Sequence, residues 1–465
     1  MDRSQTRSGM NSPALALEAT PPLWVPVQFL VTAPLFGVAF AVTLAWLGPE
    51  NLQSRWMPGL LGPVHLLVIG YVATAMLGAL QQLLPVLLGT PPAQTRTGGL
   101  LILALLAAGT AALAAGLAGT EPLLVRSGSA LLPAAVIGFM AMTLPGLVRS
   151  GVRDAAALTV TLALLALGIA TLLGLWIAAG HMGFGLGLPR HLTDVHLAWG
   201  LFGWIALLVA AVAVHVVPMF QITPPYPRAF VHVQAPALFM LLASYTILRI
   251  ASAGAPPALP ERMLEAGIAA WTAAFALLTL RVLAQRRRRL PDVTLDFWRL
   301  AMGALLGATV LWGTAQAVPG LVSQPALGLA LGWLFLSGFA VSVVNGMLYK
   351  IVPFLVWLHL NRVQVRTGMR GVRIPNLHDA IPALLQRTQF LTHAVAVTAG
   401  LATFWLPWMF YPALFAFGGS SLLLWLNLVY ALTRYRHALN AIERAGAHPT
   451  RMPTTQRGGP DTAGP

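Results

Sequence analysis

The sequence predicts an all-α integral membrane protein with about twelve transmembrane helices. Of the 465 residues, 57% are hydrophobic and only 9% are charged, whereas about a quarter of the residues of an ordinary soluble domain are charged. Long apolar runs with few charges are the second observation, because about eighteen such residues suffice to span a bilayer. Together these observations exclude a soluble globular protein. The 28 lysines and arginines form short clusters between the apolar runs, so we expect no nucleic-acid partner.

Apolar segments of at least about eighteen residues follow one another along the chain. They start near residues 22, 60, 98, 122, 156, 194, 230, 262, 296, 326, 381 and 408. An even number of spans places both termini on the same side of the membrane. We expect a cytoplasmic N-terminal tail at 1–21, a single membrane domain at 22–434, and a basic cytoplasmic tail at 435–465 whose composition is typical of disorder.

The arginines give the orientation. If the termini are cytoplasmic, the loops on that side hold most of the arginines, among them Arg149, Arg281 and Arg362. The opposite loops hold Arg55, Arg126, Arg190 and Arg262, with Arg249 at the end of a span. This asymmetry is the positive-inside signature. It predicts a protein of the bacterial inner (cytoplasmic) membrane, with both termini in the cytoplasm and the lipid bilayer as its surroundings.

A motif recurs once in every four predicted helices. Gly70-Tyr71, Gly203-Trp204 and Gly338-Phe339 are each followed, after ten residues, by a polar residue and then by a proline three positions further on. The polar residues are Gln82, His215 and Lys350, and the prolines are Pro85, Pro218 and Pro353. The copies are 133 and 135 residues apart, about the length of four helices with short loops. We predict three pseudo-symmetric four-helix units, at about 22–150, 151–290 and 291–434.

Such an architecture resembles subunit I of the haem-copper oxidase superfamily, which also has twelve helices in three arcs. The segment from His65 to Pro85 is similar to that family's second helix, whose histidine near the outer end ligates the low-spin haem. The segment from Asp194 to His232 resembles the sixth helix and the start of the seventh in C-type oxidases and nitric oxide reductases. There the histidine at the position of His196 binds the active-site copper or iron.

Several of that family's ligands are missing. Members carry a His-x-His pair early in the tenth helix, and residues 329–333 contain no histidine. They also carry a His-His copper pair in the seventh helix, and residues 241–252 contain none. These departures argue against dioxygen reduction to water by the standard mechanism. The chain also resembles the nitrogen-oxide response membrane protein NnrS, which has twelve helices with haem and copper, but it lacks that family's Gly-His-Thr-Gly-Arg motif.

Histidine is the residue type on which any cofactor site depends. The chain has 11 histidines and no cysteine, which excludes iron–sulfur clusters, thiolate copper sites and covalent c-type haem. We interpret His65 and His196, near the outer ends of their spans, as cofactor ligands, because imidazole suits iron and copper. His196 and His232 are the candidate metal ligands. The alternative is that each histidine merely bonds a backbone carbonyl at a helix end.

Gln82, His215 and Lys350 share one position of the repeated motif and form a predicted polar layer near the inner side. Its functional interpretation is the admission of protons or a small ligand from the cytoplasm. Lys350 is the only lysine of the chain, and the alternative is that its long side chain extends towards the lipid headgroups.

The acidic and aromatic residues limit the function further. The 13 acids fall in loops, tails or span ends, with Asp194 and Glu265 the deepest, which argues against a transporter coupled to protons or sodium. Most tryptophans are expected to anchor the span ends at the interface. In an alternative interpretation, Trp199, Trp204 and Trp333 lie against a porphyrin face.

Three functions remain. The resemblance implies a haem-binding protein, with copper as a second cofactor, that serves respiratory redox chemistry or a response to nitric oxide or dioxygen. As an enzyme it would be a haem/copper oxidoreductase, and a cytochrome or another membrane subunit would donate electrons. The alternatives are a permease for a small solute or metal, and a scaffold subunit without a cofactor.

Overall fold

The computed structural model describes residues 21–88, 95–149, 155–184, 187, 191–252, 255–288, 290–369, 371–377 and 379–447. Arg190 and the C-terminal residues 448–465 lie outside the described residues. The described residues form helices and loops, without a strand. The helices are α1 (Trp24–Leu47), α2 (Pro58–His65), α3 (Thr74–Leu88), α4 (Arg96–Gly119), α5 (Pro122–Arg149), α6 (Ala155–Ala179), α7 (His191–Ala198), α8 (Leu207–Gln221), α9 (Arg228–Ala251), α10 (Leu259–Ala284), α11 (Val293–Ala317), α12 (Pro325–Trp333), α13 (Ser342–Thr367), α14 (Ala383–Ala402) and α15 (Phe410–Ala447).

Eleven helical segments in the described part of the chain are long and apolar enough to cross a membrane. Leucine, isoleucine and phenylalanine side chains on the outer faces of the bundle, such as Leu172, Ile247 and Phe415, are exposed, as expected of surfaces that contact lipid. The chain is therefore an all-α protein of the lipid bilayer. The remaining predicted span, which starts near residue 381, corresponds to α14, which is less apolar because it contains Arg387 and His393.

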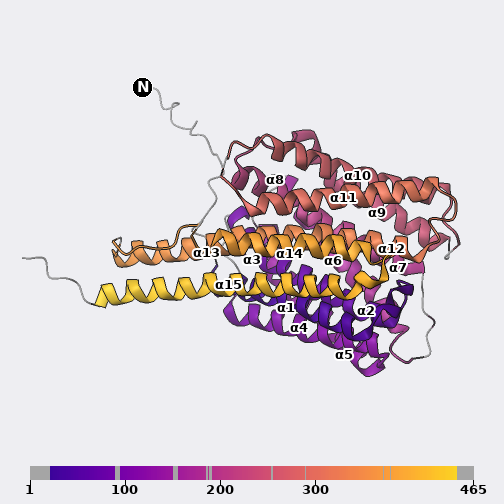
Figure 1. The fold of residues 1–465 in the computed structure, drawn as a ribbon, viewed down its shortest axis with the longest axis horizontal. Coiled ribbons are helices and arrows are strands. Elements are labelled where there is room, and N and C mark those ends of the chain that lie inside the picture. Colours follow the sequence, from indigo (N-terminus) through magenta and orange to yellow (C-terminus); the bar gives the residue numbers. More distant parts are fainter. Residues whose placement is uncertain are drawn as a thin grey trace, which may run out of the picture.

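The helices run roughly parallel to the long axis of the molecule, and α13 and α15 project beyond the others at one end (Figure 1). The guanidinium of Arg436 lies 5.5 Å from the ring centre of Trp24, so α15 passes the start of α1 at this end, here called the terminal end. Helix α15 continues to Ala447, and the tail expected from residue 435 therefore begins as helix.

Three spans contain a π-helical segment. These segments are η3 (Leu66–Ala73), η4 (Trp199–Ala206) and η5 (Leu334–Val341). Each is 8 residues long, and their first residues are 133 and 135 positions apart. They join α2 to α3, α7 to α8 and α12 to α13, so each lies inside one continuous span. Local π-helical geometry is rare and occurs frequently at functional sites.

Gly70, Gly203 and Gly338 each occupy the fifth position of a π-helical segment. A Cβ atom at these positions would lie 2.4 Å from Phe36 of α1, 2.9 Å from Ala166 of α6 and 2.6 Å from Ala304 of α11, respectively. Glycine thus permits each segment to pack closely on the span that precedes it in the chain, as η3 does on α1, η4 on α6 and η5 on α11.

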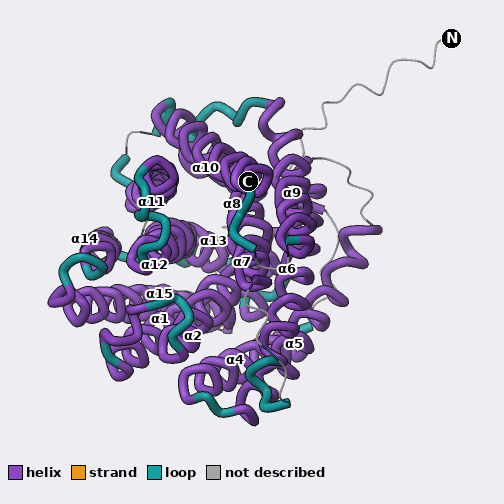
Figure 2. The backbone as a smooth tube through the Cα atoms, turned by 90° about the vertical axis from the view of Figure 1, so that its right-hand side faces the viewer, coloured by secondary structure: helices purple, strands orange, loops and turns teal. Residues whose placement is uncertain are grey.

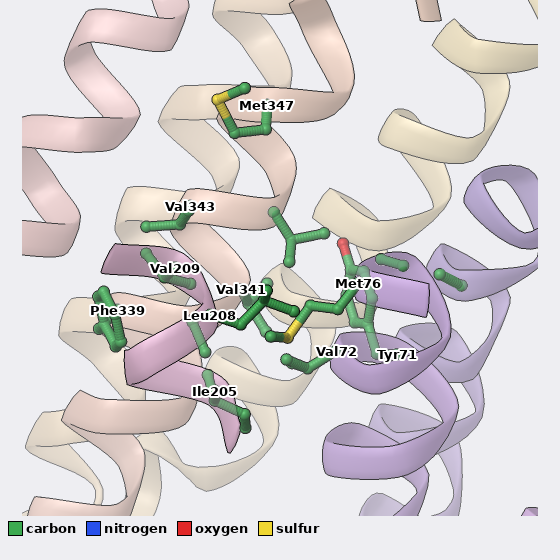
Figure 3. Packing of buried hydrophobic residues seen from close by; sticks show 14 of the residues in the cluster. Tyr71, Val72, Met76, Ile205, Leu208, Val209, Phe339, Val341, Val343 and Met347 are labelled. Atoms are coloured by element: carbon green, nitrogen blue, oxygen red, sulfur yellow. The ribbon is translucent and has the colours of Figure 1, made fainter. Parts of the chain in front are cut away.

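The same three spans form the core of the molecule. About three quarters of their most apolar windows are buried, 72%, 72% and 78%, against 50% or less for the other spans. Figure 3 shows side chains from all three meeting, with Val72, Ile205 and Val341 among them. A view along the bundle shows the remaining helices around them (Figure 2). One polar contact lies within this core, where the Tyr71 hydroxyl donates a hydrogen bond of 2.6 Å to Asn345 Oδ1.

Candidate functional site

A cavity of about 460 Å³ lies between the three central spans, at the end of the molecule opposite to the terminal end. Its volume falls in the range of cofactor and small-molecule sites, about 300–1,000 Å³. Leucine, valine and alanine side chains form most of its wall. Two of the histidines that the sequence predicts as ligands, His65 and His196, line it together.

His65 is the last residue of α2, directly before η3. Its Nδ1 atom lies 2.7 Å from the carbonyl oxygen of Leu61, one turn earlier. A backbone carbonyl can only accept a hydrogen bond, so Nδ1 carries the proton and donates. The Nε2 atom is then the unprotonated nitrogen, the one that can ligate a metal.

His196 lies on α7, and its ring is held by a different helix. Nδ1 donates a 2.9 Å hydrogen bond to the carbonyl oxygen of Ala170 on α6. A Cβ atom on Gly174, one turn further along α6, would lie 3.0 Å from the Cε1 atom of the ring. Glycine at this position makes room for the imidazole. His196 therefore has the same tautomer as His65, with Nε2 available for a ligand.

The Nδ1 atoms of both histidines are used by the backbone. Each one bonds a backbone carbonyl, as the alternative supposed, but only through Nδ1. The two rings lie close enough to interact electrostatically, and no hydrogen bond joins them. A hydrogen bond from the second ring nitrogen is typical of metal-ligating histidines, because it fixes the ring orientation and raises the basicity of the ligand.

The cavity wall contains glycines that leave space unfilled. Gly200 on η4 and Gly328 and Gly332 on α12 line the cavity, and a Cβ atom at each would meet no heavy atom within 4 Å. Glycines normally permit close approach of a neighbour, yet here no protein atom approaches. These glycines were not predicted as part of a site, although the spacing of four residues between Gly328 and Gly332 indicates one helix face.

Two tryptophans also line the cavity and differ in their hydrogen bonding. The indole nitrogen of Trp333 donates a 2.9 Å hydrogen bond to the carbonyl of Val397. Trp204 is 2% exposed, and its indole nitrogen has no hydrogen-bond partner in the described structure. A buried N–H group without a partner is uncommon in folded proteins.

Charged groups mark the rim of the cavity. Arg55 lines it and forms an ion pair with Asp194 of α7, with 2.6 Å between Nη1 and Oδ1. The Arg55 side chain is 42% exposed, so it can reach both the rim and the aqueous surface. His181, in the turn after α6, also lines the cavity, and its burial lowers the pKa of the imidazole.

The second predicted metal ligand lies elsewhere. His232 is an exposed residue near the start of α9, and its Nδ1 atom bonds the Arg228 carbonyl at 2.8 Å. It does not line the cavity that contains His196. The described residues contain no group of three or more His, Cys, Asp or Glu side chains arranged to hold a metal ion.

The predicted polar layer is not a single cluster. Gln82 is buried and His215 is exposed. Lys350 does not extend towards lipid headgroups but forms an ion pair with Asp292, with 2.8 Å between Nζ and Oδ2. The same carboxylate oxygen accepts a 2.9 Å hydrogen bond from Gln221.

Asp292 is an acid at a span end, and it is buried more deeply than the sequence predicts, since Asp194 and Glu265 were expected to be the deepest. Its side chain is 4% exposed, and it caps α11 by accepting a hydrogen bond from the Thr294 amide. Burial raises the pKa of this carboxyl, but the charge of Lys350 and three hydrogen bonds together hold the pKa below its ordinary value. The Asp-x-Thr sequence before an apolar run was the available signal, since aspartate is a preferred N-cap residue.

No protein-family model matches the chain, and the search of curated proteins gave no match.

Proposed function

We propose that the chain is a haem-binding redox protein of the membrane, in which His65 and His196 would hold the iron of one haem. The observation that carries the proposal is that both imidazoles line one apolar cavity and are both held at Nδ1, which leaves both Nε2 atoms for ligation. Haem is suited to this donor set because its iron accepts imidazole on both faces.

The shape of the cavity supports a flat, largely apolar ligand. The space beside Gly200, Gly328 and Gly332 lets a planar group approach the backbone of η4 and α12 closely. At the rim, the guanidinium of Arg55 can bind a carboxylate such as a propionate. The apolar wall keeps water from the group and so affects its reduction potential.

Two histidine ligands favour electron transfer over catalysis at the iron. When bound, haem supplies one-electron redox chemistry. If both imidazoles held the iron, a gas could bind it only after one histidine had left. Electron transfer within a respiratory system is therefore the favoured function, and a response to nitric oxide or dioxygen would require displacement of His65 or His196. Copper is not included in the proposal, because its predicted ligand His232 lies outside the cavity.

We also propose that the fold consists of three four-helix units, as in subunit I of the haem-copper oxidases. The support is the equal spacing of η3, η4 and η5 together with the glycine at the fifth position of each. In each unit the second helix packs through that glycine on the first helix, so the same contact occurs three times. The haem ligands then come from the second helices of the first and second units.

Absorbance spectra of the purified protein test the proposed function. We expect a Soret band and, in the pyridine haemochrome assay, about one haem per chain. Protein that folds in detergent, that is produced with an ample supply of haem, and that contains no haem would contradict the proposal. An exposed-histidine variant, His215→Ala, serves as the control and should retain its full haem content.

A further inference from the structure

Arginines of the loop between α10 and α11 are fixed against the end of α8. The amide of Arg287 donates a 3.0 Å hydrogen bond to the carbonyl oxygen of Ile222, directly after α8. Nη1 of Arg288 donates to the carbonyl oxygen of Phe220 at 3.3 Å, and Nη2 of Arg286 donates to a carbonyl oxygen of the loop itself at 2.6 Å. Because η4 lines the cavity and α8 leads away from it, this loop lies at the terminal end.

Positive charge exceeds negative charge at this place. Arg286 and Arg288 are half-buried and lie close enough to Lys350 to repel it electrostatically. Lys350 pairs with Asp292, and the two side chains are 13% and 4% exposed. Three cations thus lie near one carboxylate that is already bonded to one of them. An unbalanced charge is costly where it is shielded from water, so a bound anion would stabilise this part of the fold.

Exposed apolar side chains adjoin these arginines. Met219, Ile222 and Leu290 are 48%, 54% and 59% exposed. The carbonyl oxygens of Ile222 and Leu290 accept the hydrogen bonds from the Arg287 amide and from Arg286, so their side chains belong to the same small region. Ile222 has a φ of 53°, a strained conformation for a β-branched residue, and its carbonyl is one of those that fix the arginine loop. Cations beside apolar surface suit a ligand that has both an anionic and an apolar part.

We propose that Arg286 and Arg288, with Lys350 behind them, bind the phosphate group of one anionic phospholipid at the terminal end. The planar guanidinium matches the spacing of phosphate oxygens, and basic pockets between transmembrane helices hold anionic headgroups. The acyl chains would lie against Met219 and Ile222. The site is at the opposite end of the molecule from the cavity and does not depend on the proposed haem.

Native mass spectrometry of the full-length, delipidated protein in detergent tests the proposal with two lipids, dioleoylphosphatidylglycerol and dioleoylphosphatidylcholine. Both have the same acyl chains and a phosphate diester, but the choline headgroup carries its own cation. We expect about one phosphatidylglycerol per chain to be retained at lipid concentrations at which phosphatidylcholine is lost. Equal retention of the two lipids by wild type would overturn the proposal, and this comparison needs no variant.

Paired arginine variants locate the site. Arg286→Gln/Arg288→Gln should weaken the retention of phosphatidylglycerol at least about tenfold, because two charge-assisted contacts are lost. Arg366→Gln/Arg444→Gln is the matched control, since it removes two charges from exposed positions of α13 and α15 and should leave retention unchanged. Equal losses in the two double variants would overturn the proposal. Arg286→Lys/Arg288→Lys keeps both charges and should retain more lipid than the glutamine variant; retention no greater than in that variant would also overturn it.

Inorganic phosphate distinguishes a lipid headgroup from a soluble phosphate compound. Wild type loaded with phosphatidylglycerol is titrated with sodium phosphate, and sodium chloride of the same ionic strength is the control for screening. We expect the two salts to release the lipid equally, because free phosphate lacks the apolar part that contacts Met219 and Ile222. Release by phosphate and not by chloride would assign the arginines to a soluble phosphate compound and overturn the lipid assignment.

Discussion

His65 and His196 enter the same cavity from two spans that are far apart in the sequence, and each is fixed through Nδ1. His65 bonds a carbonyl of its own helix, at Leu61, whereas His196 bonds Ala170 on the neighbouring helix α6. The orientation of the His196 ring therefore depends on how α6 and α7 pack. This dependence makes α6 a place where the proposed haem site can be perturbed without removal of a ligand.

Gly174→Ala should alter the haem spectrum. The added Cβ would lie 3.0 Å from Cε1 and 3.4 Å from Nδ1 of His196, so the ring must move by a few tenths of an ångström. We expect a changed low-spin signal in the electron paramagnetic resonance spectrum, with the haem content retained. Gly168→Ala is the matched control on the same helix, where the new Cβ would have only an ordinary 3.6 Å contact with Met140. Equal spectra from the two variants would contradict the proposed role of the α6 contact.

Filling the open space beside the cavity glycines should exclude the haem. Gly332→Leu and Gly200→Leu each place a large side chain in open space, because a Cβ atom added at either glycine would meet no heavy atom within 4 Å. Both variants should therefore fold and purify normally. We expect the haem content per chain to fall at least about tenfold, since a loss of 1.4 kcal/mol in binding already gives that factor. Gly307→Leu is the control, because it has the same freedom on an exposed face of α11. Retention of full haem content in Gly332→Leu would refute the placement of the haem.

Replacement of each of the three equivalent glycines by alanine should destabilise the fold. Gly70→Ala, Gly203→Ala and Gly338→Ala each place a Cβ under 3.0 Å from the preceding span. Overpacking of this kind costs about 1–3 kcal/mol, so each variant should unfold at a lower denaturant concentration than wild type. Gly303→Ala, on α11 with open space around it, should not. A Gly203→Ala variant as stable as wild type would argue against equivalent contacts in the three units.

The Lys350–Asp292 ion pair should make the stability of the fold sensitive to acid. The pKa of Asp292 is held below its ordinary value of 3.8. The contribution of ionised Asp292 to the stability of the fold is therefore complete at higher pH and is lost as the pH falls below about 4. Asp292→Asn should remove this part of the pH dependence and also leave the Lys350 ammonium buried without its counter-charge, which costs about 3–5 kcal/mol.

Denaturant unfolding at neutral pH and at pH 3 measures both effects. Wild type should lose stability between the two values, whereas Asp292→Asn should be less stable at neutral pH and change less on acidification. Restoration of stability by Lys350→Met in the Asp292→Asn background would identify the unpaired charge as the cause. An identical pH dependence in wild type and Asp292→Asn would show that the pair does not contribute.

The sequence predicts the helices well because hydrophobic length alone determines which segments can cross a bilayer. Each predicted start lies within a few residues of a helix in the structure. The least apolar of the predicted spans is α14, which packs against α11 and α15. Its His393 is buried, whereas its Arg387 is exposed and forms an ion pair with Asp296. The helical continuation of α15 past residue 435 was missed because that segment is polar and resembles a disordered tail.

The sequence singled out the two histidines that line the cavity, His65 and His196, but it did not predict their surroundings. His65 and His196 were singled out because their segments resemble helices of the haem-copper oxidases and because imidazole suits iron and copper. The contact between His196 and Ala170, the open space at Gly332 and the unsatisfied N–H of Trp204 depend on packing between distant helices, for which no local pattern exists. Lys350 illustrates the same limit, because its partner Asp292 belongs to another span.

Low-temperature electron paramagnetic resonance of the oxidised protein tests the central claim most directly. Wild type should show the low-spin signal of a haem with two imidazole ligands. His65→Ala and His196→Ala should each lose that signal, giving high-spin haem or none, and the exposed-histidine variants His215→Ala and His232→Ala should keep it. A wild-type low-spin signal that survives both His65→Ala and His196→Ala would contradict the claim that these two residues hold the haem.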